Sequence, residues 1–599
     1  MSRVGQTAGE KLDVRGGARS VGRAPSGGCE GRQDARYEMG EGMRGAVRGE
    51  VTQAMRDVRA GSGESVDRQG GADGGVRVDP LARRVHRGRF QVSLVWEGSL
   101  VGIAGGLVVT LYRLALSWAE TTVRAIAGVA AGNPPLVIGW FVALALMACV
   151  VGLLVRWEPD TAGSGIPQVD AEVMGALHMR WPRVLAAKFI EGTLGALGGL
   201  SMGREGPSVQ LGGMAGKAVS RVLGRGRGEE RLLVTCGAGA GMAAAFHAPL
   251  TGVMFALEEI HKTFSAPLII SVMSAAVLAD YVTSQLLGLS PVIAFRLSGF
   301  LPHETYVVLV PFAIVMGILG ALHNRGMFFA QDVLSKLRWH APFVRLLIPF
   351  MIAGVVVFVA PDLIDGGDAI IERLEEPGNL SFALLCGLLV GKYLFTSVCF
   401  GSGAPGGTLF PLVAMGALAG ALLGKVVVAV LGLDPSLVTN FMVLGIAGLF
   451  AGAIRSPVTA VVLAFELTGS LTALLSLSVV SVIAYVTANL LKVDAYYEHL
   501  LGRLVGVSAE EAHGRWGAEG RQLHSYGVEA GSALDGAVIG EVSWPEHALV
   551  VTVSRLGSDL VPHGDSRLEA GDRILVLFDA SAEDRAESKV KALCRGALV

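Results

Sequence analysis

The sequence contains three short glycine-rich stretches inside otherwise apolar segments: GSGIP at residues 163–167, GREGP at residues 203–207 and GSGAPGGTLFP at residues 401–411. In each stretch glycines precede a proline, and an apolar run follows. Proline is favoured in the first turn of a helix, so each stretch predicts a helix that begins inside apolar sequence. Helix N-termini carry free N–H groups and partial positive charge, and several that converge would bind an anion.

The composition places these interruptions in a membrane. The chain has 599 residues, of which 51% are hydrophobic and 17% charged, and its mean hydropathy is +0.52. Soluble proteins are about 25% charged, so an ordinary soluble enzyme is excluded. Irregular backbone at membrane depth must be buried in protein or line a cavity. The net charge of −2 gives no basic surplus, so no nucleic-acid partner is expected.

The glycine-rich stretches could instead be kinks used only for helix packing, although three of them in one chain make this less favoured. They could also bind a nucleotide phosphate. The sequence, however, has no G-x-x-x-x-G-K-[ST] motif and no βαβ setting for one. Helix starts that converge on an anion are therefore the favoured interpretation.

The chain divides into three parts. Residues 1–80 hold 18 glycines and 12 arginines without hydrophobic periodicity, and we expect them to form a disordered tail. Residues 81–505 form the expected all-α transmembrane domain. Residues 520–599 form a small α/β domain, with strands expected at Ala548–Val553 and Ile574–Phe578. The apolar runs of the transmembrane domain lie near 93–117, 134–155, 183–200, 232–257, 267–288, 305–322, 343–360, 382–400, 408–433, 441–466 and 471–491.

Basic residues at the ends of this domain predict its orientation. Four arginines precede the first run, and Lys492 and Arg503 follow the last one. By the positive-inside rule, both termini are expected on the cytoplasmic side of a cell (inner) membrane.

GSGIP, GREGP and the later glycine-rich segment, in this order, resemble the CLC chloride channel and transporter family over residues 90–505. The resemblance implies a homodimer with an independent pore in each subunit. It also implies an inverted repeat of many tilted and broken helices in each subunit. Transporters of this kind place their sites where helices are discontinuous.

The resemblance assigns roles residue by residue. Ser164 would donate a hydrogen bond to the central chloride, although it could instead cap the following helix. Glu205 would be the external gate that competes with chloride and carries the proton. Glu259, 54 residues later, matches the inner proton acceptor of exchangers, whereas channels typically carry an apolar residue there. Taken alone, Glu258 and Glu259 could be a solvated acidic helix end.

Further anion contacts are implied by the same resemblance. The backbone N–H groups of Gly206, Thr408, Leu409 and Phe410 would bind chloride, with Leu409 standing where the family commonly has Phe. Tyr497, selected over Tyr496 by the Leu-Leu-x-Arg that follows, would be the second side-chain donor; the alternative is an interfacial anchor. Glu466 also matches a family acid and is interpreted as structural, with a vestibule role as the alternative, while Arg204 could snorkel to the surface or pair with an acid. The departures at Gln168 and His247 carry no assigned mechanism.

The leading hypothesis is therefore proton-coupled chloride antiport without a cofactor or a metal ion. A passive, voltage- or pH-gated chloride channel of the same fold is the alternative. A membrane enzyme or sensor is disfavoured, because no nucleophile–base pair or metal-ligand cluster is evident. Residues 525–598 resemble the TrkA-C domain of potassium-conductance regulators, which implies a module that binds a small ligand, dimerises or merely stabilises the protein.

Overall fold

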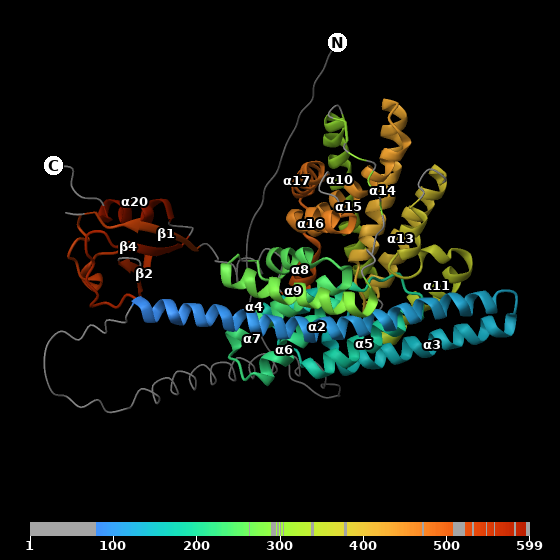
Figure 1. Ribbon diagram of the computed structural model, residues 1–599, viewed down its shortest axis with the longest axis horizontal. Coiled ribbons are helices and arrows are strands. Elements are labelled where there is room, and N and C mark those ends of the chain that lie inside the picture. The colour runs from blue at the N-terminus through green and yellow to red at the C-terminus, as the bar shows by residue number, and fades with distance from the viewer. Residues whose placement is uncertain are drawn as a thin grey trace, which may run out of the picture. The chain divides into compact units, whose positions relative to one another are not determined.

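The computed structural model describes residues 80–594, apart from positions 263, 289–294, 296, 298, 300, 303–304, 337–340, 376–379, 470–472, 507–520, 530–531, 547, 556–557 and 580–582. The predicted disorder of the N-terminal tail lies outside these residues. The transmembrane part is helical, and two successive halves follow each other along the chain (Figure 1).

The first half runs from α2 to α9. Its elements are α2 (Pro80–Ala130), α3 (Pro134–Trp157), η2 (Pro159–Thr161), α4 (Ile166–Met174), α5 (Trp181–Leu197), α6 (Glu205–Val222), α7 (Arg227–Phe246), α8 (Pro249–Phe255), the π-helical turn η3 (Ala256–Ile260) and α9 (Ala266–Leu287).

The second half runs from α10 to α17, and α18 follows it. Its elements are α10 (Tyr306–Ser335), α11 (Ala341–Val359), η5 (Pro361–Leu363), α12 (Asp368–Arg373), α13 (Phe382–Gly401), α14 (Leu409–Leu431), η7 (Pro435–Leu437), α15 (Val438–Ile454), α16 (Pro457–Thr468), α17 (Leu474–Leu490) and α18 (Tyr496–Val505).

The two halves repeat the same order of elements. A long first helix is followed by α3, η2 and α4 in one half and by α11, η5 and α12 in the other. The sequence PDTAGSG at 159–165 corresponds to PDLIDGG at 361–367, a shift of 202 positions that also relates the starts of α4 and α12. The contacting pair α6–α7 corresponds to the pair α14–α15. This internal repeat agrees with the expected two-half architecture.

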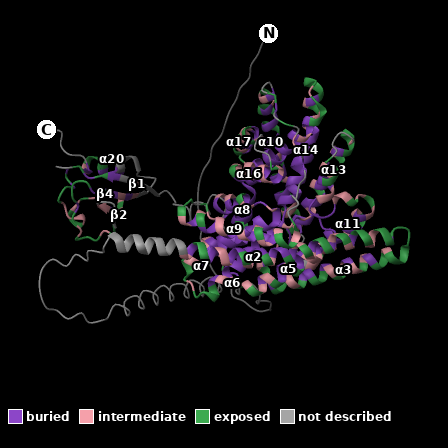
Figure 2. Ribbon diagram, in the orientation of Figure 1, coloured by how far each residue is buried: buried purple, intermediate pink, exposed green. Residues whose placement is uncertain are grey.

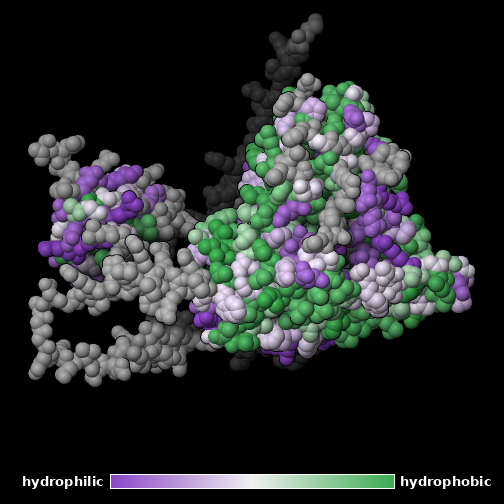
Figure 3. All heavy atoms as spheres, viewed as in Figure 1, coloured by the Kyte–Doolittle hydropathy of each residue, from purple (hydrophilic) through white to green (hydrophobic). Residues whose placement is uncertain are grey.

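Seven helices in the described part of the chain are long and apolar enough to cross a bilayer. They differ in burial: α15 is buried along nearly its whole length, whereas only five residues of α3 are buried (Figure 2). Large apolar side chains lie exposed along α2, among them Trp96, Leu107 and Trp118, and apolar residues cover much of the face seen in Figure 3. Such a surface suits lipid and not water.

Small residues allow the helices to pack closely. Gly98, Gly102 and Gly106 line the face of α2 that packs against α9. A Cβ on Gly98 would lie 2.5 Å from the Ser271 carbonyl oxygen. A Cβ on Gly102 would lie 2.4 Å from the Ala275 carbonyl oxygen. Small residues at four-residue spacing bring membrane helices together in this way.

The C-terminal domain is a four-stranded antiparallel sheet in the order β1-β4-β2-β3 with one helix. Its elements are β1 (Arg521–Gly527), η9 (Ile539–Glu541), β2 (Ala548–Arg555), β3 (Ser558–Leu560), β4 (Arg573–Asp579) and α20 (Glu583–Cys594). The two expected strands are confirmed as β2 and β4. Arg555 donates two hydrogen bonds to the buried Asp572 and holds the pKa of that carboxyl below its usual value, which ties β2 to the turn before β4.

Candidate anion site

The three glycine-rich stretches are hydrogen-bonded to one another through their backbones. Gly203 and Gly407 exchange two N–H···O bonds of 2.6 and 2.7 Å, as an isolated antiparallel bridge. Gly163 donates to the Gly403 carbonyl at 3.2 Å and accepts from Gly406 at 3.0 Å. These bonds bring the starts of α4, α6 and α14 to one place. Backbone groups of broken helices at this depth need such internal partners.

Two of the glycines are required by geometry. Gly165, the N-cap of α4, has φ of 99°, in the left-handed region that side chains rarely adopt. A Cβ on Gly206 would lie 2.5 Å from both the carbonyl oxygen and the Oγ of Ser164, and 3.1 Å from the Cα of Gly407. The stretches can therefore meet only because these side chains are absent.

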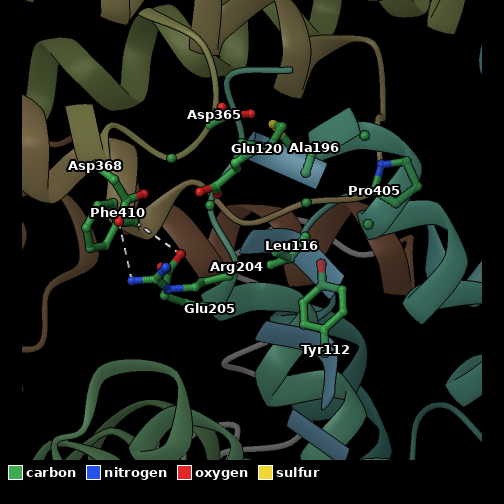
Figure 4. Close-up of a pocket in the computed structure, with 16 residues that line it drawn as sticks. Tyr112, Leu116, Glu120, Ala196, Arg204, Glu205, Asp365, Asp368, Pro405 and Phe410 are labelled. Carbon is green, nitrogen blue, oxygen red and sulfur yellow. Dashed lines mark hydrogen bonds and ion pairs between the residues drawn. The ribbon is translucent and has the colours of Figure 1, made fainter. Parts of the chain in front are cut away.

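Glu205 is the first residue of α6, and its side chain is fully buried. Its Oε2 accepts a hydrogen bond of 3.2 Å from the Phe410 N–H, in the first turn of α14, while Oε1 has no partner among the described residues. Figure 4 shows this carboxylate beside Arg204. The carboxylate thus binds the Phe410 N–H group, which the family resemblance assigned to the anion.

The Arg204 side chain contacts α12 and the Phe410 ring. It pairs with Asp368 of α12 at 3.5 Å, and its guanidinium carbon lies 5.1 Å from the centre of the Phe410 ring. A cation over an aromatic face is stabilised by the ring quadrupole. Arg204 therefore joins α12 and α14 across the start of α6.

The side chains of Ser164 and Tyr497 lie close together. Both side chains are buried, and neither hydroxyl makes a hydrogen bond to any described residue. Ser164 does not cap α4, because the N-cap is Gly165. Two buried hydroxyls without partners are unusual in proteins and are available to a ligand.

Tyr496 has a different environment from Tyr497. Its hydroxyl accepts a 2.9 Å hydrogen bond from Thr408 Oγ1, and its ring packs edge-on against the Tyr497 ring at 5.2 Å. Thr408, Leu409 and Phe410 are all buried at the N-terminus of α14. Of the two tyrosines, only Tyr497 has an unpaired hydroxyl within the described structure.

Glu259 lies in the π-helical turn η3 and is buried. Its Oε2 accepts a 2.6 Å hydrogen bond from Ser456, the N-cap of α16. Charged groups around it are Lys262, Asp170 and Glu498. π-helical turns inside helices often mark functional positions, because the extra residue redirects the side chains.

Glu258 and Glu466 are reciprocal helix caps. Glu258 accepts hydrogen bonds from Val458 N, Thr459 N and Thr459 Oγ1 at the start of α16. Glu466, within α16, accepts the corresponding three bonds from Leu250 and Thr251 at the start of α8. The alternative of a solvated acidic helix end therefore does not describe the pair, because Glu258 is bonded to the start of α16 and Glu259 is buried.

The sequence contains a signal for this exchange of caps. The segments APLTGVMFALE at 248–258 and SPVTAVVLAFE at 456–466 share Pro, Thr and Glu at the same spacing. Each is preceded by a non-glycine residue with positive φ, His247 at 54° and Arg455 at 76°. His247 Nδ1 also lies 3.2 Å from Asp280 Oδ1. Recognising the repeat would have predicted the caps.

Two buried lysines support the helix starts and are not predicted from the sequence. Lys188 donates to the carbonyl oxygens of Thr161 and Gly163 at 2.8 and 2.7 Å. Lys392 donates to the carbonyls of Leu363, Ile364 and Asp365. Each lysine stands 15 residues before a glycine of the Gly203–Gly407 bridge. Gln168 supplements them by donating to the Ala162 carbonyl at 2.7 Å.

Comparison with known proteins identifies the family to which this chain belongs. The profile of the family described as voltage gated chloride channel matches residues 146–489, more than half of the chain, and that of the TrkA-C domain matches residues 523–591. The chain belongs to the CLC family. It is a multi-pass membrane protein, and its relatives are transporters and not enzymes, as expected.

Individual relatives support the assignment. The H(+)/Cl(-) exchange transporter ClcA of Vibrio cholerae is 34% identical over 438 residues, covering 71% of this chain and 92% of its own. ClcA of Salmonella agona is 31% identical over 451 residues, covering 73% and 94%.

Solved structures show the same fold. The structure of a slow cyanobacterial Cl-/H+ antiporter superposes with a TM-score of 0.66 at 27% identity, covering 69% of this chain and 98% of its own. A CLC-type fluoride/proton antiporter, at 20% identity and a TM-score of 0.57, is similar in fold.

The contact between the glycine-rich stretches predicts the effect of Gly206→Ala. The added methyl group would overlap Ser164, and such overpacking costs about 1–3 kcal/mol. We expect a lower melting temperature in detergent and reduced chloride flux. The matched control is Gly387→Ala in α13, where a Cβ meets nothing within 4 Å. Equal stability of the two variants would contradict the described contact.

Proposed function

We propose that this protein is a proton-coupled chloride antiporter in which Glu205 is the external gate. The observation that carries the proposal is the Glu205 carboxylate, which is bound to the Phe410 N–H at the start of α14. A chloride ion and an ionised carboxylate compete for such N–H groups, because both are anions that helix N-termini stabilise.

Protonation would decide this competition. A neutral carboxyl is held less strongly at a helix N-terminus than a carboxylate, so proton binding favours its departure and the entry of chloride. The unpaired hydroxyls of Ser164 and Tyr497, with the backbone N–H groups of Gly206 and of α14, would then contact the anion. Chloride and the ionised Glu205 carboxylate thus alternate at one position. Because the carboxylate leaves when it binds a proton, this alternation links the movements of chloride and protons.

Glu259 would deliver protons from the cytoplasmic side. Glu205 and Glu259 both lie near Tyr497, so the chloride site proposed at the Tyr497 hydroxyl would lie between the two acids. Glu259 is buried, and its only hydrogen-bond partner given by the described structure is Ser456. An ionisable side chain buried in this way inside a membrane protein is typical of a proton relay.

The alternative is a passive chloride channel of the same fold. A channel needs the anion site and the gate but has no use for an inner proton acceptor. The presence of Glu259, together with the exchange transporters and the antiporter among the similar proteins, supports exchange. We also propose location in the cell inner membrane with both termini cytoplasmic, assembly as a homodimer, and a regulatory ligand or dimerisation role for the TrkA-C domain.

Glu205→Ala tests the gate. The variant lacks the group that competes with chloride and carries the proton, so we expect chloride flux to persist while coupled proton uptake falls to that of protein-free liposomes. The measurement is parallel recording of chloride and pH in proteoliposomes. Proton pumping by this variant would refute the role of Glu205.

Glu259→Ala tests the inner acceptor, and Glu258→Ala is its matched control. We expect Glu259→Ala to abolish proton movement and retain chloride flux. Glu258→Ala removes a cap of α16, which costs about 0.5–2 kcal/mol, and should lower thermal stability while preserving coupling. Normal proton uptake in Glu259→Ala, or loss of coupling in Glu258→Ala alone, would reverse the assignment.

A further inference from the structure

Glu205 borders a small, partly open cavity with about 20 Å³ of space for the centres of water molecules, enough to hold at least one water. Figure 4 shows its charged lining: Glu120 of α2, Arg204 and Glu205 at the start of α6, and Asp365 and Asp368 beside α12. Neither Ser164 nor Tyr497 lines it. On the proposed function, this cavity is the outer mouth through which chloride passes beyond the gate.

The charge of this mouth opposes an anion. Its lining carries four carboxyl groups and one guanidinium, and Arg204 is already paired with Asp368. Lys392 and Arg124 beside Asp365 offset part of this charge, and carboxylates that remain ionised would repel an approaching chloride ion. The acids therefore need a role that is compatible with the passage of chloride, and protonation of some of them provides one.

Asp365 is the acid without a structural task. Its side chain is only 2% exposed, and neither carboxylate oxygen has a hydrogen-bond partner among the described residues. The neighbouring ammonium group of Lys392 bonds the Asp365 carbonyl oxygen and not its carboxylate. Burial of an ionised carboxylate without hydrogen bonds is unfavourable, so this group is suited to hold a proton.

The internal repeat shows that the backbone does not require aspartate here. Asp365 corresponds to Gly163, and both residues have positive φ, 57° and 68°. In both halves, a buried lysine bonds the carbonyl of this residue. Glycine adopts the conformation without strain, whereas aspartate does so at a cost. The repeat therefore assigns the carboxyl of Asp365 a role other than shaping the turn.

We propose that Asp365, with Glu120, is the outer proton relay of the transporter, which exchanges protons between the external solution and Glu205 through water in the cavity. The proton leaves a hydronium ion, resides on a carboxyl of the mouth and passes to Glu205, and no other bond changes. The charged groups that face Asp365 are Glu120 and Arg124 of α2, Lys392 of α13 and Asp368 of α12.

The test is the pH dependence of chloride efflux from proteoliposomes with equal pH on both sides, with proton uptake recorded in parallel. The variants are Asp365→Asn and Asp365→Gly. The glycine variant keeps the backbone conformation of the repeat and removes only the carboxyl. Asp362→Asn is the matched control, because Asp362 lies three residues away, pairs with Arg373 and does not line the cavity.

We expect wild-type efflux to rise as the pH falls. A positioned acid or base accelerates proton transfer by about 10²–10⁴-fold, so both Asp365 variants should need at least about one pH unit more acid for half-maximal efflux. Asp362→Asn should follow the wild type. An unchanged midpoint in both Asp365 variants, or a pH-independent wild type, would overturn the relay. The inference rests on the proposed function, but chloride efflux without proton uptake in the wild type would refute antiport alone, and the midpoints would still decide the relay.

Discussion

The structure depends on one constraint: helices that break at membrane depth must satisfy their backbone polar groups inside the protein. The chain meets it by pairing the breaks with each other. The Gly203–Gly407 bridge and the bonds of Gly163 to Gly403 and Gly406 join stretches that lie far apart in the sequence. Because glycine has no side chain, the three helix starts converge on a single point.

The same constraint explains the buried charges. Lys188 and Lys392 bond the carbonyl groups that precede α4 and α12, and Glu258 and Glu466 bond the N–H groups that begin α16 and α8. Each pair is related by the internal repeat. With these groups satisfied, the start of α14 meets the carboxylate of Glu205, and the hydroxyls of Ser164 and Tyr497 remain unpaired among the described residues. A site for a mobile anion needs such unpaired donors, whereas the groups of a structural ion pair are already bonded to each other.

Local sequence patterns are enough to predict the helix starts and the membrane part. Glycine and proline have local conformational effects, and apolar runs of about 20 residues reflect the thickness of a bilayer. The choice of Tyr497 over Tyr496 relies on its place before Leu500, Leu501 and Arg503, and the structure gives only Tyr497 an unpaired hydroxyl in its described part. The roles of Glu205 and Glu259 in transport remain predictions.

The long-range partners cannot be predicted in the same way. Local sequence suggests a solvated helix end for Glu258, because its partner, the start of α16, lies 200 residues away. Nothing in the local sequence marks Lys188, Lys392 or Asp365, because a lysine or an aspartate has no local signature of what it faces. Alignment of the two halves would have paired Lys188 with Lys392 and would have set Asp365 against Gly163, which has no side chain.

The central claim is that chloride and the ionised Glu205 carboxylate compete for one position, so that chloride and proton movements are coupled. The most direct measurement is proton movement in proteoliposomes that contain the wild-type protein, an imposed chloride gradient and no pH gradient. The account predicts that chloride leaving the vesicles drives protons inward, so that the vesicle interior becomes more acidic than the external solution. Chloride efflux that leaves the internal pH unchanged would contradict it.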